Sequence, residues 1–472
     1  MTETADQKSS RRDFLQGSGS KIFPVTALAG AIHARAYAQQ NNTIQVALVG
    51  CGGRGTGAAV DALSVRNGPI KLVAMADVFQ DRLDTSIESL RGLVREPAPS
   101  NPDAPALKAE QVDVPKERQF AGFDGYKHAI DCLRPGDVAI FATPPAFRWV
   151  HFQYAIEKGV NVFMEKPISV DGPSARKMFQ LGELSEAKNL KVGVGLMCRH
   201  CVARKALLEH IQDGRIGEIV SLRAYRMHGP VGFFSSPPKP PDVSELLYQV
   251  RRFHSFIWAS GGAFNDFYIH NIDECCWMKG GWPIKAEAGG GRFRVDNSVD
   301  QNFDNYCVQY TFADGATLQL WGRCIDGCYE EFASYAHGRS GSAVISTSAH
   351  TPARCRIYRG QDVTRAEDEV WSFPQPEPNP YRLEWDNLID AIRKDRPYNE
   401  VKRGNEASLV TTMGRYAAHT GQVVTYEQML NHPVDLAPGV DRLTMDSPAP
   451  LRADAEGRYP VPEPGVKTDR EY

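Results

Sequence analysis

The stretch TIQVALVGCGGRGTGAAVDAL, residues 43–63, decides the fold of the first half of the chain. An apolar, β-branched run leads into the glycine pattern Gly50-x-Gly52-x-x-Gly55, and an alanine-rich helical pattern follows at once. Between a strand and a helix, such glycines allow a tight turn and let a pyrophosphate approach the backbone at the helix N-terminus. The stretch therefore predicts a strand, a phosphate-binding loop and a helix.

The next apolar run, IKLVAMAD, ends in Asp77, about twenty residues after the last glycine of the pattern, the usual distance in dinucleotide-binding folds. A carboxylate there accepts hydrogen bonds from the adenine ribose and repels a 2′-phosphate, which favours NAD over NADP. An aspartate after a strand is also a common helix cap, but the glycines favour the cofactor interpretation. The residues expected against the cofactor here are Gly50, Gly52, Gly53, Arg54, Gly55 and Asp77.

Apolar runs and helical patterns continue to alternate as far as KVGVGLM at 191–197. Near-continuous apolar strands separated by helices are typical of a parallel sheet that is covered on both faces. We therefore predict a doubly wound, Rossmann-type dinucleotide-binding domain over residues 42–198.

The pattern changes from about residue 219. Strand-like segments such as NYCVQYTFADGATLQLWGRC alternate with turn signals, and Asp314-Gly315 marks a hairpin. We predict a second α/β domain, residues 199–437, with a large, open-faced, mainly antiparallel sheet. The Pro-rich segment 438–472 cannot form a core alone and is expected to lie as an arm on the body or on another subunit.

Short motifs in the first half resemble those of the Gfo/Idh/MocA family of oxidoreductases. They are ATPP at 142–145, His151 and EKP at 165–167. The resemblance implies that Lys166 reaches both the nicotinamide ribose and the substrate. It also places Thr143, Pro144, His151 and Glu165 near the cofactor.

Candidate catalytic residues occur in SGGAFNDFYIHNIDECCWM, where Asp266, His270 and Asp273 recur at i, i+4 and i+7 on one helical face. Oxidation of an alcohol needs a base for the hydroxyl proton, and a histidine held by a carboxylate is suited to that role. The family resemblance implies that His270 is the base and Asp266 its partner. Together with Lys166, these are the predicted catalytic residues.

A sugar pocket is expected to contain aromatic and guanidinium groups, because aromatic rings stack on pyranose faces and arginines bind hydroxyls. The candidates are Arg199, Tyr225, Tyr248, Trp258 and Arg323. Single arginines and aromatics are more often structural, so these five are candidates only.

The N-terminus carries SSRRDFLQ at 9–16, followed by a short apolar run and HARAYA, in which Ala36 and Ala38 fit a signal-peptide cleavage site. The run is shorter than the roughly 20 apolar residues that span a bilayer. Arg11 and Arg12 resemble the twin-arginine (Tat) signal, and we predict a signal peptide over residues 1–38. The expected location is periplasmic or secreted, with the Tat machinery as a partner.

The net charge and the cysteine spacing argue against two classes, nucleic-acid-binding proteins and metal-binding proteins. The 472 residues carry a net charge of −3, which gives no electrostatic reason to expect a nucleic-acid partner. The ten cysteines are scattered, and Cys198-x-x-Cys201 lacks a second ligand pair at zinc-like spacing, so no metal site is expected. A homo-oligomer is expected.

The predicted export limits how the enzyme could regenerate its cofactor. A cofactor made inside the cell must be bound before export and then recycled on the enzyme. One hypothesis is oxidation of a sugar, polyol or glycoside hydroxyl coupled to reduction of a second carbonyl compound. The alternatives are a redox-neutral, NAD-dependent glycoside hydrolase and a non-catalytic, nucleotide-retaining sugar-binding protein.

Overall fold

The structure is a computed structural model, and it describes residues 42–94, 106–294 and 296–472. The predicted signal peptide lies outside these ranges. None of the helices within them combines the length and apolar character needed to cross a bilayer. The residues from Thr43 to Tyr472 form one compact unit.

The first part of this unit is a six-stranded sheet in the order β3-β2-β1-β4-β5-β6, with every neighbouring pair parallel. This order is that of the Rossmann fold, so the predicted doubly wound sheet is confirmed. Apart from the edge strand β3, its strands are almost fully buried, as expected when helices cover both faces. The strands are β1 (Ile44–Val49), β2 (Ile70–Asp77), β3 (Gln119–Ala121), β4 (Val138–Phe141), β5 (Asn161–Met164) and β6 (Val192–Val194). The connecting helices are α2 (Gly53–Leu63), α3 (Gln80–Gly92), α4 (Gly125–Asp131), α5 (Arg148–Glu157) and α6 (Gly172–Ala187).

Two glycines in the first turn are required by close backbone contact. Gly50 has φ +96°, and a Cβ there would lie 2.6 Å from the backbone of Thr143. A Cβ on Gly55 would lie 1.9 Å from the carbonyl oxygen of Gly50. The glycine pattern therefore lets α2 start directly against the end of β1.

The second sheet has nine strands in the order β14-β13-β12-β11-β7-β10-β9-β8-β15. Its described pairs are antiparallel except β7 with β10. Along β10, buried Leu318 and Leu320 alternate with exposed Gln319 and Trp321, so one face of the sheet is open as predicted. The strands are β7 (Ile219–His228), β8 (Lys285–Gly291), β9 (Asn305–Thr311), β10 (Thr317–Cys324), β11 (Glu331–Gly338), β12 (Ser342–Thr347), β13 (Arg356–Tyr358), β14 (Glu369–Ser372) and β15 (Val424–Thr425).

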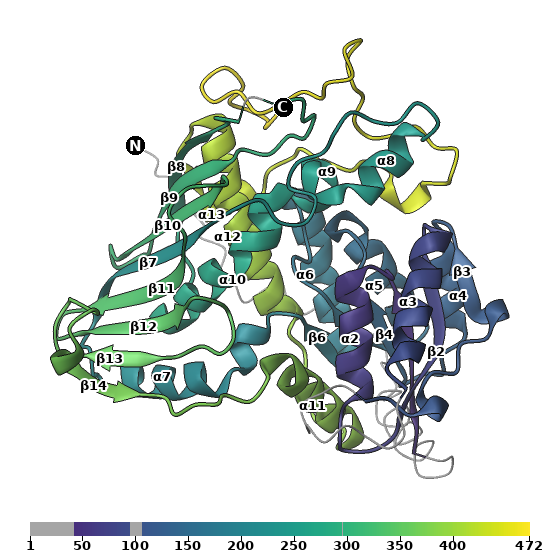
Figure 1. Cartoon of the computed structure of the whole chain (residues 1–472), viewed down its shortest axis with the longest axis horizontal. Coiled ribbons are helices and arrows are strands. Elements are labelled where there is room, and N and C mark those ends of the chain that lie inside the picture. The colour runs from purple at the N-terminus through teal and green to yellow at the C-terminus, as the bar shows by residue number, and fades with distance from the viewer. Residues whose placement is uncertain (1–41, 95–105, 295) are drawn as a thin grey trace, which may run out of the picture. The chain divides into compact units, whose positions relative to one another are not determined.

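Helices α10 (Gly262–Lys279) and α12 (Val401–Thr420) pack against each other and against the other face of this sheet (Figure 1). Helix α12 also contacts α6 and β6 of the first sheet, so it links the two sheets through one buried element. The remaining helices of the second part are α7 (Val202–Gln212), α8 (Glu245–Arg251), α9 (Ile257–Ser260), α11 (Pro380–Arg393) and α13 (Tyr426–Leu430).

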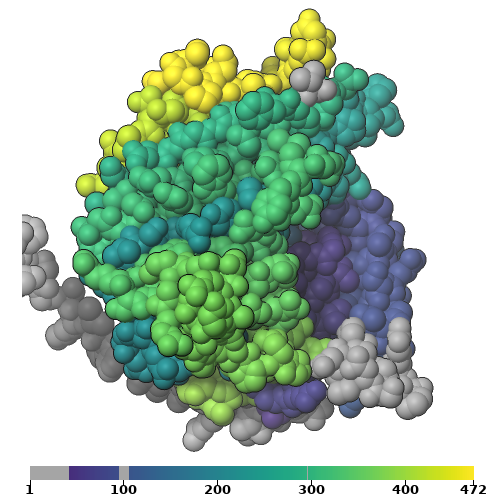
Figure 2. All heavy atoms as spheres, turned by 60° about the vertical axis from the view of Figure 1, so that its left-hand side comes forward, coloured from purple at the N-terminus to yellow at the C-terminus, as the bar shows by residue number. Residues whose placement is uncertain are grey.

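The Pro-rich segment after residue 438 lies on the body of its own chain, where its yellow atoms cover teal and green ones in Figure 2. The amide of Gln249 donates to the carbonyl of Leu451 at 2.7 Å, and Gln301 donates to the carbonyl of Pro460 at 2.7 Å. The ring of Tyr459 packs edge-on against Phe256 at 4.8 Å between centroids.

Glu471 ends this segment in a buried ion pair. Its carboxylate accepts two hydrogen bonds from Arg415, both 2.8 Å long, and one from His419 at 2.7 Å. Burial alone would raise the pKa of Glu471, but the charge of Arg415 and the bonds to His419 outweigh it and lower the pKa to about 2. The ionised carboxylate therefore stabilises the folded chain.

We predict that Glu471→Gln lowers the free energy of unfolding by about 3–5 kcal/mol at neutral pH, because it leaves the guanidinium of Arg415 buried without a counter-charge. The same pair makes stability depend on pH. Its contribution is complete above the pKa of an unfolded glutamate, about 4.3, and is lost as the pH falls toward about 2. Urea unfolding of the wild type and the variant, measured from neutral pH down to about pH 2, tests both the loss of stability and its pH dependence.

Glu463→Gln is the matched control, because Glu463 lies on the same segment but forms an exposed i,i+4 pair with Lys467. It should change stability by less than about 1 kcal/mol. Equal effects of the two substitutions would contradict the assignment of stability to the buried pair.

Candidate active site

A cavity of about 490 Å³ lies where the carboxyl ends of the parallel strands face helix α10. Ligands of open α/β sheets bind at this edge. The turn after β1, Asp77 of β2 and residues directly after β4 and β5 line one side, and α10 contributes Asp266 and His270. Ten of the eleven residues expected at the cofactor line this cavity, namely Gly50, Gly52, Gly53, Arg54, Gly55, Asp77, Thr143, Pro144, Glu165 and Lys166.

The turn at the start of α2 fits the phosphates of a dinucleotide. Gly52 is the N-cap, no side chain caps the helix, and its first turn contains no acidic residue. A Cβ on Gly53 would meet nothing within 4 Å, so the space in front of the first helical amides is open. The free N–H groups and the helix dipole there favour an anionic ligand.

Asp77 fits the ribose end of the same ligand. Its carboxylate accepts hydrogen bonds from the backbone amides of Cys51, at 2.7 Å, and Phe79, at 2.9 Å, which fix its direction. Burial raises the pKa of Asp77, and these two hydrogen bonds oppose that rise. Each carboxylate oxygen keeps a lone pair for a hydroxyl donor.

His151, the eleventh of these residues, lies behind the cavity wall. Its Nδ1 is 3.2 Å from the hydroxyl of Thr143, and it lines a small apolar pocket with Tyr126 and Phe147. Burial, together with the nearby charge of Arg148, lowers the pKa of His151 to about 3, so the ring is neutral. It therefore supports Thr143 from behind.

Lys166, directly after β5, meets Asp266 of α10 inside the cavity. The Lys166 ammonium donates to the backbone carbonyl of Asp266 at 2.6 Å and lies 3.4 Å from its Oδ1. The other carboxylate oxygen lies 3.0 Å from Nε2 of His254. Burial raises the pKa of Asp266, but the charge of Lys166 and the hydrogen bonds from Lys166 and His254 together hold it well below its usual range.

The tautomer of His254 follows from its two bonds. The backbone amide of Phe233 donates to Nδ1 at 3.1 Å, so Nε2 carries the proton that faces Asp266. The sequence-based expectation that Asp266 holds His270 is corrected here. Among the described residues, the Asp266 side chain bonds to Lys166 and His254 and not to His270.

His270 lies one turn after Asp266 and is buried, with 7% of its surface exposed. Its Nδ1 has no hydrogen-bond partner among the described residues. Burial, and then the positive charges of Lys166 and Arg226, lower the pKa of His270 well below its ordinary value. The ring is therefore neutral at neutral pH and can accept a proton.

Glu165 joins the loop after β5 to the glycine turn. Its Oε1 lies 3.0 Å from Nε of Arg54, whose guanidinium also stacks over the ring of Tyr381. Gly195 is needed for this arrangement, because a Cβ there would lie 2.6 Å from Oε2 of Glu165. Glu165 and Arg54 thus close one wall of the cavity by an ion pair.

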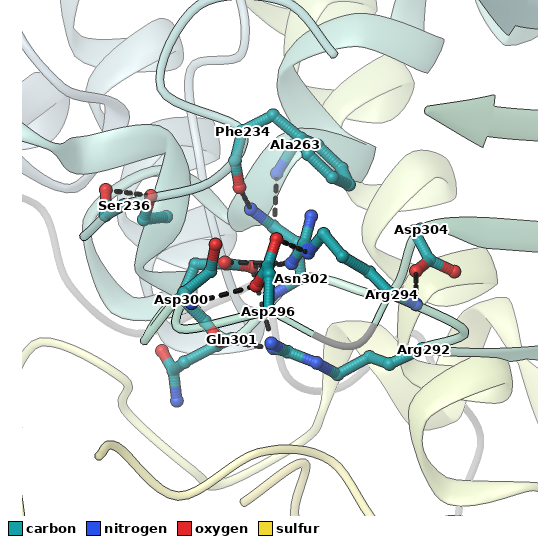
Figure 3. A network of polar contacts seen from close by, with 12 residues as sticks. Phe234, Ser236, Ala263, Arg292, Arg294, Asp296, Asp300, Gln301, Asn302 and Asp304 are labelled. Atoms are coloured by element: carbon teal, nitrogen blue, oxygen red, sulfur yellow. Dashed lines mark hydrogen bonds and ion pairs between the residues drawn. The ribbon is translucent and has the colours of Figure 1, made fainter. Parts of the chain in front are cut away.

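The loop before α10 is held by the polar network of Figure 3. The side chain of Asn302 accepts a hydrogen bond from the amide of Ala263, at 2.9 Å, and donates to the carbonyls of Phe234, at 2.7 Å, and His254, at 2.9 Å. Asp300 in turn accepts from the backbone amide of Asn302 at 3.0 Å and pairs with Arg294 at 2.8 Å. One buried amide therefore fixes both the start of α10 and the residue that faces Asp266.

The five residues predicted to line a sugar pocket do not line this cavity. The guanidinium of Arg199 binds both oxygens of fully buried Asp273, at 2.7 and 2.9 Å. That bidentate pair also accounts for Asp273, the third member of the i, i+4, i+7 series. Both residues are structural because each satisfies the charge of the other.

The other four candidates for the sugar pocket do not line the cavity, either because of the strand position they occupy or because they are buried. Tyr225 lies on β7 at the opposite parity from cavity-lining Arg226, and Arg323 lies on the neighbouring strand with its guanidinium on the carbonyl of Tyr329. Tyr248 is buried and donates to the carbonyl of Pro237. Trp258 is fully buried and donates to Gln249 at 2.7 Å.

Several cavity residues were not predicted from the sequence. They are Arg82, Arg148, Arg226, His254, His350 and Tyr381. A signal existed only for His254, which lies in the stretch RRFHSFIWASGGAF just before the predicted catalytic helix. His350 lies after β12 in the stretch STSAH, which carries no motif.

The chain is similar in sequence to a known family domain and to known dehydrogenases. Residues 205–344 match the family model described as the GFO/IDH/MocA C-terminal domain. The chain is 26% identical to an inositol 2-dehydrogenase of Rhizobium meliloti (strain 1021) over 270 residues, which are 56% of this chain and 73% of the relative. It is 23% identical to a scyllo-inositol 2-dehydrogenase (NAD(+)) of Bacillus subtilis (strain 168), over 56% of this chain and 69% of the relative.

Solved structures share the fold. An aldose-aldose oxidoreductase from Caulobacter crescentus, complexed with glycerol, has a TM-score of 0.60 at 16% identity and covers 81% of this chain and 99% of its own. A levoglucosan dehydrogenase in complex with NADH and levoglucosan has a TM-score of 0.59 at 16% identity and covers 82% and 100%. The relatives matched in sequence are named dehydrogenases, which supports an NAD(P)-dependent oxidoreductase.

We predict that Asn302→Ala destabilises the protein by about 3 kcal/mol, because it leaves a buried amide and two buried carbonyls without partners. Urea unfolding measures the loss. Asn305→Ala is the control, because that side chain is only partly buried and bonds to Gly291 and Asp304 away from α10. It should cost about 1 kcal/mol, and an Asn302→Ala protein as stable as this control would contradict the role of the network.

Proposed function

We propose that the chain is an exported oxidoreductase that uses NAD to oxidise a CH–OH group of a sugar, polyol or glycoside, with the cofactor retained and recycled on the enzyme. One observation carries the proposal. Lys166 of the first part and His270 of the second lie in the same cavity as the glycine turn and Asp77. The named relatives, which include inositol and levoglucosan dehydrogenases, support the substrate class.

In this proposal His270, Lys166 and Asp266 have separate roles in the oxidation. The nicotinamide ring of the bound cofactor supplies the acceptor for the hydride that leaves the carbon. Neutral His270 takes the hydroxyl proton as the carbonyl forms, and the Lys166 ammonium donates to the oxygen that develops charge. Asp266 keeps the ammonium in place through the bonds described above.

Cofactor retention follows from the predicted export. Nicotinamide dinucleotides are made inside the cell, so an exported enzyme has no pool with which to exchange. A second carbonyl substrate would then take back the hydride and regenerate the starting form.

The export proposal predicts that protein recovered from outside the cytoplasm carries about one NAD(H) per chain, and that Arg11→Lys with Arg12→Lys leaves the protein in the cytoplasm. Cell fractionation locates the protein, and mass spectrometry of the nucleotide released on denaturation distinguishes NAD from NADP. Unchanged export of the double variant would contradict the twin-arginine route. Exported protein without any dinucleotide would contradict retention.

The catalytic proposal predicts that His270→Ala lowers turnover by about 10²–10⁴-fold and leaves the bound nucleotide in place. The absorbance of reduced nicotinamide during incubation with a panel of sugars measures the rate. Because the pKa of His270 is lowered, the wild-type rate should fall only at a pH well below the ordinary histidine range.

Tyr268→Phe is the control for this substitution. Tyr268 lies on the same helix, is fully buried, and directs its hydroxyl to Cys324, 3.7 Å away, instead of to the cavity. Its loss should leave turnover unchanged, whereas near-normal turnover of His270→Ala would remove the mechanism. Cleavage of p-nitrophenyl glycosides without net change in nicotinamide absorbance would instead identify the redox-neutral hydrolase.

A further inference from the structure

The charges that line the active-site cavity do not balance. Five cationic side chains line it, namely Arg54, Arg82, Arg148, Lys166 and Arg226, against the three carboxylates Asp77, Glu165 and Asp266. Arg54 pairs with Glu165, and Lys166 pairs with Asp266. The cavity therefore has an excess of two positive charges that no residue of its lining compensates.

The unpaired arginines lie at different places. Arg82 lies against the glycine turn, where a Cβ on Gly52 would be 2.9 Å from its Nη1, and Arg148 donates to the carbonyl of Thr143 at 2.9 Å. Both therefore belong to the walls assigned to the dinucleotide. Arg226 lies on β7 in the second part of the unit, on the side of the cavity that carries His270 and His350.

Arg226 is held by neutral groups alone. Its Nε donates to Nε2 of His228 at 2.9 Å and its Nη1 to Nε2 of His350 at 2.8 Å. The face of its guanidinium lies 3.8 Å from the ring centroid of Phe332. No carboxylate of the described residues forms an ion pair with it, and two of its five N–H donors are used.

The two histidines are neutral because a guanidinium only donates, so both Nε2 atoms must accept. His228 places its proton on Nδ1, which lies 2.5 Å from the carbonyl of Gly229. The proton of His350 must also lie on Nδ1, and that atom is buried without a partner among the described residues. Arg226 lines the cavity, so the unused N–H donors there are those of its guanidinium, which His350 helps to hold in place.

We propose that Arg226, oriented by His350, forms a subsite for a carboxylate of the substrate, so that the enzyme acts on acidic sugars such as uronic acids or their glycosides. The proposal rests on the function proposed above and adds the charge of the substrate to it. One planar guanidinium with a single full charge matches a carboxylate, which is planar and carries one negative charge. Burial lowers the pKa of Arg226, which is the direction expected for a guanidinium without a counter-charge.

The test compares matched pairs of ligands on the purified, cofactor-loaded protein. The probes are D-glucuronate against D-glucose, D-galacturonate against D-galactose, and their methyl glycosides. Titration calorimetry measures binding, and nicotinamide absorbance measures oxidation. Wild-type protein should bind at least one uronate about 10- to 150-fold more tightly than its neutral partner, the range for a hydrogen bond to a charged group.

Arg226→Met should abolish this preference, and Arg226→Lys should keep part of it. The chain offers a matched control in Arg223, three residues earlier on β7. Arg223 donates from Nε to Nε2 of His337 at 3.0 Å and stacks on Tyr335 at 5.2 Å, but it does not line the cavity. Arg223→Met should therefore keep the full preference for uronates.

Wild-type protein that binds no uronate more tightly than the neutral sugar would overturn the subsite, whether or not the Arg226 variants fold. So would a preference that survives in Arg226→Met, or tighter binding of glucose 6-phosphate than of any uronate. Failure of the proposed oxidoreductase function gives a different result, in which uronates bind with the Arg226-dependent preference but no sugar changes the nicotinamide absorbance. Equal oxidation of neutral and acidic sugars would leave that function standing and remove the subsite.

Discussion

The guanidinium of Arg415 connects the segments on which the active-site geometry depends. It is fully buried on α12 and donates to the carbonyl of Val170, at 3.0 Å, and to that of Gly261, at 3.2 Å. Val170 follows the Glu-Lys-Pro motif, and Gly261 caps α10, so one side chain ties the Lys166 loop to the helix that carries Asp266 and His270. A buried guanidinium needs a counter-charge, which Glu471 supplies from a segment far away in the sequence. The C-terminal segment is therefore part of the active-site scaffold.

The cavity separates its charges so that the ring of His270 stays neutral. Asp266 is committed to Lys166 and His254, so no carboxylate of the described residues is hydrogen-bonded to His270. Burial and the neighbouring cations then keep the ring neutral. A carboxylate paired with this histidine would instead raise its pKa and increase the fraction of the ring that is already protonated near neutral pH. Arg226 and His350 lie on the same side of the cavity as His270, and Arg226 keeps N–H groups for the anionic group proposed above.

Much of the fold could be predicted from local sequence patterns. The glycine turn, the alternation of apolar strands with helices, and the change to turn-punctuated strands near residue 219 each depend on residues close together in the sequence. The spacing of Asp266 and His270 likewise puts both on one helix face, and both line the cavity. The prediction of the sugar-binding residues was wrong, because residue type alone does not show whether a side chain is buried. Trp258, Tyr248 and Arg199 have the right chemistry for a sugar, yet each one satisfies a partner inside the core.

The sequence by itself determined the class of both sheets, the phosphate-binding turn and the helix that carries the candidate base. All of these follow from periodicity and from the conformations that glycine alone adopts without strain. The tertiary structure decided which charges meet. Lys166 contacts a helix 100 residues later in the chain, His254 takes the carboxylate expected for His270, and Arg226 meets His350 from a loop 124 residues away. Such pairings depend on the register of a mixed sheet and on the packing of α10 and α12, and no local pattern encodes them.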